Sequence, residues 1–445
     1  MDGTKMVALS APRTAARLRR TAGSSAALRA EVAAWLAQRR ADRRFRRFTA
    51  HFDALEAVLL RMLDRLDAEL ADPPPDPGQC YERCRWLDGR LAVVRRLFDW
   101  YAVKYDQRLD DHPHAVLMRA ADEVVRGCWQ AAFVVAGVTP PTGPVCFLDT
   151  GTDGHSVRRC SVPADFRVPE DDPLAEFVAR LPVPVVALPE VAAREPWWLV
   201  VAAHETGHHV QHDLDLVTAT VDAVRDAAPA DLQREWRTWS GEVFADVFSV
   251  LMVGGAAAWA VEELQFGSPD HLLRPVGPYP PPVVRSAVLG EVLIGMGTPA
   301  AGVDAAREWL TGRTGPLRDR ALRHLAAVSD VVSALLGIPL GEKALRSLVD
   351  RDVLSHTSRV ERWAEQLGRV KPVITPLDTR AAPRVLLAAA VHRHRTTDDA
   401  DPPLSGRNLV AALTRSGAPG LLAGTPDRDL GGLADDLADL LLGGA

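Results

Sequence analysis

The chain has 445 residues, of which 47% are hydrophobic and 25% are charged, and its formal net charge is -6. This composition excludes a disordered or fibrous chain, and the acidic balance argues against bulk affinity for nucleic acid. A single hydrophobic core rarely extends over so many residues, so we expect two or three domains. The basic residues are almost all arginine and alanine is abundant, a pattern typical of a GC-rich bacterial genome.

The cysteines and the apolar segments indicate the compartment. Five thinly spread cysteines favour free thiols in a reducing cytoplasm over a disulfide framework. The first twenty residues contain no apolar segment of signal-peptide length. The longest apolar run, residues 247–261, is shorter than the roughly 20 residues that a membrane-spanning helix needs. We therefore expect a cytoplasmic protein without a membrane span.

The N-terminal third has helical periodicity. Apolar residues recur every three or four positions from about residue 25 to 70. Two further helical stretches follow, at about residues 81–109 and 113–135. Together they predict an α-helical bundle over residues 1–136.

The pattern of residue types changes after the proline- and glycine-rich segment 136–144. This segment marks a domain boundary because it cannot continue a helix. Residues 145–149 and 183–188 are short and rich in β-branched residues, which predicts strands. Helices are predicted at about residues 195–213 and 239–266.

These elements predict a central domain over residues 137–285 that contains a small β-sheet. A proline-rich loop ends it near Pro282, and residues 286–445 have mostly helical patterns. The expected fold is therefore mainly α, with a C-terminal α-helical region that packs on the central domain.

The central domain carries a histidine-rich helix. His204, Glu205 and His208 spell H-E-x-x-H. Residues four apart on a helix differ by about 40° around its axis and about 6 Å along it, so both imidazoles can bind one zinc ion. Glu205 would lie beside the metal and could accept a proton from bound water. His209 and His212 are expected to be bystanders, and solvated histidines at an emerging helix are the alternative for the whole group.

A second pair of polar residues lies on the next helix. Glu242 and Asp246 are four residues apart among valines and phenylalanines. A carboxylate in so apolar a helix needs a partner, which a zinc ion bound by two imidazoles would provide for Glu242. Asp246 could accept a hydrogen bond from a ligand histidine. An ordinary salt-bridged pair is the alternative.

H-E-T-G-H followed by a helix with E-x-x-x-D resembles the gluzincin group of zinc metallopeptidases. The resemblance implies that His204, His208 and Glu242 bind one zinc ion and that Glu205 is the general base. It further implies that Asp246 supports a ligand and that the substrate is a peptide or protein.

The resemblance covers residues 183–285 and implies a zincin-like fold for the central domain. In zincins an edge strand lies along the cleft, and the substrate peptide adds to it as a further strand. The segment 182–189 suits that role, with an ordinary core strand as the alternative.

Peptide hydrolysis also needs a hydrogen-bond donor for the oxyanion. Tyr279 and Arg285, in a proline-rich segment after the second helix, are the candidates. A structural tyrosine and a salt-bridged arginine are the alternatives. Four further histidines are weaker candidates for the site: His155, His271, His324 and His356.

Two other functions remain open. A catalytically inactive pseudo-protease would keep the zinc and serve as an interaction or regulatory protein. A nucleic-acid-associated protein could use the six arginines from Arg39 to Arg47, although these can also pair with Asp53, Glu56 or Asp64. We expect the peptidase and no binding of nucleic acid.

Overall fold

The structure is a computed structural model that describes residues 11–149, 155–157, 182–300, 302–349, 357–374, 381–396, 402–416 and 430–443. The described residues are mainly helical with a small sheet, as predicted. The chain divides into two compact units. The first unit comprises Met1–Asp106, Arg159–Val183 and Leu421–Ala445, and the second comprises Gln107–Arg158 and Pro184–Gly420.

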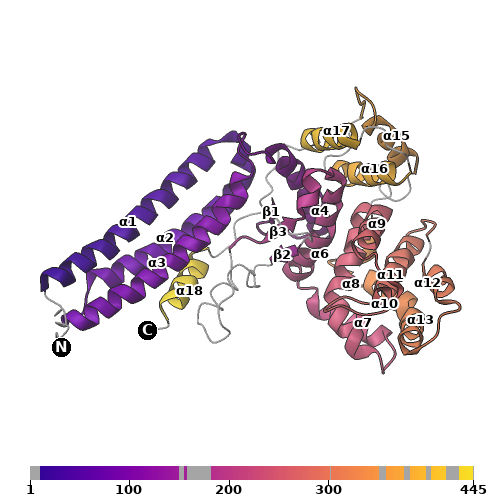
Figure 1. Ribbon diagram of the computed structural model, residues 1–445, viewed down its shortest axis with the longest axis horizontal. Helices are drawn as coiled ribbons and strands as arrows, with labels where there is room; N and C mark the ends of the chain where they lie inside the picture. Colours follow the sequence, from indigo (N-terminus) through magenta and orange to yellow (C-terminus); the bar gives the residue numbers. More distant parts are fainter. Residues whose placement is uncertain are drawn as a thin grey trace, which may run out of the picture. The chain divides into compact units, whose positions relative to one another are not determined.

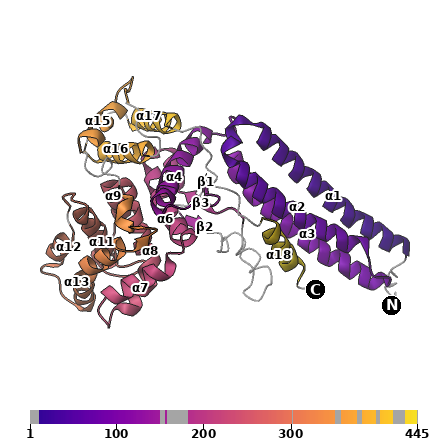
Figure 2. The ribbon, with the colours of Figure 1, turned by 180° about the vertical axis from the view of Figure 1, so that it is seen from behind.

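The first unit is a bundle of long helices. Helices α1 (Ala11–Ala41), α2 (Thr49–Ala71) and α3 (Pro77–Asp106) lie side by side (Figures 1 and 2). The short helix α18 (Leu430–Leu442) packs on α2. Leucines and valines at helical spacing, such as Leu55, form the buried core.

The sequence predicts one continuous helical stretch over residues 25–70, but the chain reverses within it. A 3-10 helix, η1 (Arg43–Phe48), separates α1 from α2. Asp42 is extended (φ -84°, ψ 123°), and its carboxylate accepts a hydrogen bond from the backbone N–H of Arg44. Asp42 thus caps the new turn, which hydrophobic periodicity alone does not reveal.

The arginine cluster makes ion pairs within the first unit. Arg40 pairs with both Asp53 and Glu56, as the alternative in the sequence analysis expects. Asp64, the third acid considered, pairs with Arg29 instead. Three members of the cluster, Arg39, Arg40 and Arg44, form ion pairs with acids.

The second unit contains a three-stranded sheet of order β1-β3-β2. Strand β3 (Val185–Leu188) pairs in parallel with β1 (Val145–Leu148) and antiparallel with β2 (His155–Val157). All four residues of β3 are buried, which suits their apolar side chains. Of the two alternatives for this segment, the structure supports the ordinary core strand over the edge strand, because β3 is paired on both sides.

The remaining helices are mostly where the sequence predicts them. The predicted helix 195–213 begins with a 3-10 turn, η4, before α6. The predicted helix 239–266 is divided at Gly254, whose φ of 61° and ψ of -141° favour glycine. The other elements of this unit are α4 (Ala115–Ala136), η3 (Glu190–Ala193), η4 (Pro196–Val200), α6 (Val201–Asp213), α7 (Val217–Ala227), α8 (Gln233–Val253), α9 (Gly255–Leu264), α10 (Pro269–Leu272), α11 (Pro282–Gly295), α12 (Val303–Leu310), α13 (Pro316–Leu336), β4 (Pro339–Leu340), β5 (Lys343–Ala344), η5 (Leu345–Leu348), α15 (Thr357–Leu367), α16 (Ala382–Thr396) and α17 (Pro402–Arg415).

Helices α6 and α8 pack closely, and this contact places the histidine motif (Figure 1). Gly207 of α6 lies directly over α8: a Cβ atom added to it would lie 3.1 Å from the Cα of Ala245 and 3.0 Å from the Phe248 ring. The absence of a side chain at Gly207 therefore lets the two backbones approach. Among the described residues, no helix combines the length and apolar character needed to cross a membrane.

Candidate metal centre

Three potential metal ligands converge between α6 and α8. His204, His208 and Glu242 each present one ligand atom, and these atoms lie within 4.8 Å of one another. An oxygen of Glu242 lies 3.3 Å from Nε2 of His204 and 3.5 Å from Nε2 of His208. The two imidazole planes are inclined by 86°.

These separations fit a zinc ion. Two donors bound at about 2.0–2.1 Å to a tetrahedral ion lie about 3.4 Å apart, close to the two distances between histidine nitrogen and Glu242 oxygen. Two imidazoles and a carboxylate leave one tetrahedral position open, which is the coordination of catalytic rather than structural zinc sites. The residues present therefore fit a zinc ion with one exchangeable position.

Asp246 lies behind the first of these histidines. One of its oxygens is 3.0 Å from Nδ1 of His204, and the residue is fully buried. Arg285 donates two hydrogen bonds to the same carboxylate, from Nε at 2.5 Å and from Nη2 at 2.7 Å. Asp246 can thus orient His204 so that Nε2 points at Glu242, while Arg285 compensates the buried negative charge.

The electrostatic environment favours positive charge at His204. Burial by itself lowers the pKa of His204, but the adjacent Asp246 and Glu242 carboxylates raise it to about 10. Burial raises the pKa of Glu242, yet the neighbouring His204 and His208 hold it below its usual range. The cluster therefore attracts a cation, and a divalent metal ion satisfies the same carboxylates that otherwise stabilise a proton.

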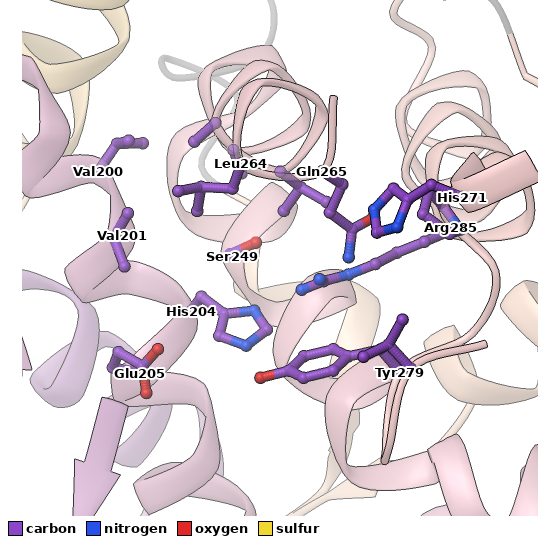
Figure 3. A pocket seen from close by; sticks show the side chains of 15 residues that line it. Val200, Val201, His204, Glu205, Ser249, Leu264, Gln265, His271, Tyr279 and Arg285 are labelled. Atoms are coloured by element: carbon purple, nitrogen blue, oxygen red, sulfur yellow. The ribbon is translucent and has the colours of Figure 1, made fainter. Parts of the chain in front are cut away.

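Glu205 and His204 face a cavity of about 350 Å³ (Figure 3). The hydroxyl group of Tyr279 points toward the same space. Burial raises the pKa of Tyr279 to about 12, so its hydroxyl group is a neutral donor at ordinary pH. The structure therefore gathers a carboxylate and a phenol beside the three potential ligands.

Arg285 is a salt-bridged arginine, which is the alternative to an oxyanion donor. It is 7% exposed, it is bound to Asp246, and its guanidinium carbon lies 4.8 Å from the centre of the Tyr279 ring. Burial by itself lowers the pKa of Arg285, and the Asp246 carboxylate more than offsets this, so that the pKa is raised. The guanidinium is thus a fixed positive charge between Asp246 and Tyr279.

The other histidines of the helix lie outside the cluster. His209 is buried, and its Nε2 lies 3.1 Å from the carbonyl oxygen of Val185, so it donates to strand β3 and fixes α6 on the sheet. His212 lies beside Asp213, with Nδ1 3.2 Å from the carboxylate. That neither of them binds a metal ion stays a prediction.

The four weaker candidates are scattered. His271 lines the cavity (Figure 3). His324 is buried beside Trp239, 3.1 Å from Glu235, and burial lowers its pKa. His155 is on β2, where only the backbone is described, and His356 lies outside the described residues.

Two contributors to the site were not identified from the sequence. Gly207 permits the close approach of α6 and α8, and the glycine inside the motif was the available signal. The apolar wall of the cavity comes from η4 and from α9, residues such as Val200 and Val261. Nothing in the sequence pattern indicated that α9 turns back toward the motif.

Comparison of the chain with protein-family models, with curated proteins and with solved structures found no match.

Proposed function

We propose that this protein is a zinc-dependent metallopeptidase of the gluzincin type, with one zinc ion bound by His204, His208 and Glu242. The observation that carries the proposal is the convergence of three ligand atoms from two helices. The two separations between a histidine nitrogen and the Glu242 oxygen are close to those of a tetrahedral site. Glu205 and His204 line one cavity, and this access for a substrate supports a catalytic rather than a structural site.

A zinc ion held by His204, His208 and Glu242 would supply Lewis-acid chemistry, which would polarise a substrate carbonyl and lower the pKa of a water molecule. Glu205 accepts the proton of the attacking water and passes it to the leaving nitrogen of the peptide bond. Its place next to His204 on α6, facing the cavity, supports this role.

Tyr279 is the proposed donor to the oxyanion that forms when water adds to the carbonyl. Its hydroxyl group is neutral, and it faces the cavity that holds Glu205. Arg285, the other candidate, is assigned to a positioning role, because Nε and Nη2 both donate to Asp246.

The experiment that tests this function is cleavage of an unfolded protein, such as reduced casein, by the zinc-loaded enzyme. We expect wild-type activity to fall about 10²–10⁴-fold in Glu205→Gln, because the variant cannot accept the proton. Glu190→Gln, at the exposed first position of η3, is the matched control and should retain activity. Equal cleavage by wild type and Glu205→Gln would refute the mechanism. A protein that binds zinc yet cleaves nothing would support the pseudo-protease alternative.

A further inference from the structure

A second cavity adjoins the first one. We call the cavity beside His204 the inner pocket and this second cavity, of about 280 Å³, the outer pocket. Gln265 and Pro282 line both, so the two pockets are neighbours along one surface. The outer pocket is formed by the end of α9, the segment that follows it, α10, α11 and α12. Phe266 and Trp309 are among its lining residues, and Glu262 of α9 is the one carboxylate among those described.

Large apolar side chains are exposed around these pockets. Phe266, in the outer pocket, is 86% exposed, and Val276 and Leu264, in the inner pocket, are 54% and 45% exposed. Exposed apolar side chains gathered in one place are characteristic of a surface that binds another molecule, since each is unfavourable in water. Three of them at two adjacent pockets indicate an apolar ligand.

The lining of the inner pocket indicates uncharged side chains as ligands. One side of its wall is apolar and includes Ala260 and Leu264, whereas Arg285 and His271 line the polar side. Among the described residues that line it, Glu205 is the one carboxylate. A cationic side chain would therefore compete with the role proposed for Glu205, whereas an aliphatic side chain would bury apolar area against the wall.

We infer that the inner and outer pockets together bind an extended polypeptide segment that carries two apolar side chains, one in each pocket. The inference rests on the proposed function, which places the scissile peptide bond beside the inner pocket. It adds the outer pocket as a second binding site for the substrate, away from the proposed metal ligands. The substrate class is thus an unfolded segment or loop with two spaced apolar residues, rather than any accessible peptide bond.

The division of this surface into two pockets favours an extended segment over a folded partner. Two concave pockets with Gln265 and Pro282 between them fit separate side chains of one strand-like chain. In an extended segment, alternate side chains point to opposite sides. The number of residues between the two apolar side chains therefore decides whether both can enter the pockets.

Binding of labelled peptides to the zinc-loaded Glu205→Gln protein tests the inference without cleavage. The probes are fluorescein-labelled peptides of glycine, serine and asparagine with two leucines separated by one to six residues, compared with peptides that carry one leucine. We expect one spacing to bind at least about tenfold more tightly than either single-leucine peptide, because a second buried side chain contributes.

Two variants of the outer pocket should remove that gain. Phe266→Ser deletes an exposed wall, and Ala305→Trp fills the pocket from an exposed position on α12. The matched controls are Val370→Ser, at 82% exposure, and Ala326→Trp, at an exposed position on α13; both should keep the gain.

Three results would overturn the inference. The first is a two-leucine series that binds no more tightly than the single-leucine peptides. The second is an affinity gain from the second leucine that survives both outer-pocket variants. The third is conversion of a dimer to a monomer by Phe266→Ser in sedimentation experiments. The last would assign the apolar surface to a second copy of the chain. Because the readout is binding, these results are distinguishable from a failure of metal loading or of cleavage.

Discussion

Gly207 of α6 lies so close to Ala245 of α8 that a Cβ atom on Gly207 would be 3.1 Å from the Cα of Ala245. This contact involves backbone, which cannot move aside as a flexible side chain can. The same helix crossing brings Glu242 to within 3.5 Å of both ligand histidines. The geometry of the proposed metal ligands therefore depends on a glycine that is not one of them.

Gly207→Ala should destabilise the protein and weaken zinc binding. Overpacking of this kind costs about 1–3 kcal/mol, and the helices must separate to admit the methyl group. Gly241→Ala on α8 is the control, because the nearest atom to its new Cβ is a side-chain oxygen of Gln211 at 3.8 Å. Urea unfolding and zinc competition titrations measure both effects. Unchanged zinc affinity in a folded Gly207→Ala protein would contradict the dependence on helix approach.

Arg285→Met should be strongly destabilising, because it leaves the fully buried Asp246 carboxylate without its cation. Loss of one partner of a buried ion pair typically costs about 3–5 kcal/mol. The double variant Arg285→Met/Asp246→Asn should lose less than the sum of the two single variants, since the unpaired charge is gone. Denaturant unfolding of all four proteins measures this coupling, and additive losses would argue against it.

Tyr279→Phe should lower kcat about 10²–10³-fold with little change in KM, because an oxyanion donor acts mainly in the transition state. Steady-state cleavage of a quenched fluorescent peptide separates the two constants. Tyr81→Phe, in the first unit, is the control. A change confined to KM would instead place Tyr279 in ground-state substrate binding.

The Cys128 thiol should be unreactive in the native protein. Burial raises its pKa from 9.0 to about 12, which lowers the thiolate fraction at pH 8 about a thousandfold. Alkylation with iodoacetamide followed by peptide mass mapping should label Cys128 only after denaturation. Rapid labelling of the folded chain would show that this part of α4 opens. Cys128 is one of four free, buried cysteines in the described part of the chain, as the thin spread of cysteines predicts.

Local patterns predicted most of the helices and most of the residues that lie together at the candidate site, because the causes of these patterns lie within a few residues. The H-E-x-x-H spacing fixes where two imidazoles lie on one helix, and the apolar neighbours of Glu242 and Asp246 signal that these acids are buried. The burial of Asp246 and the convergence of Glu242 with the histidines agree with that reasoning.

Features that depend on distant partners were not predictable in the same way. The reversal at Asp42 depends on one capping hydrogen bond, and the break at Gly254 depends on a backbone angle that only the folded chain reveals. Edge strand and core strand both remained open for β3, because its sequence cannot specify how many neighbouring strands it has. The cavity wall requires α9 to turn back toward α6, which is a tertiary arrangement.

The zinc content of the purified protein, measured by mass spectrometry, tests the central claim most directly. His208→Ala and His212→Ala, both on α6, are the matched pair of variants. The account predicts one zinc ion per chain in the wild type and in His212→Ala, and a large loss of zinc in His208→Ala. A folded wild-type protein that binds no zinc, or a His208→Ala protein that retains it fully, would contradict the account.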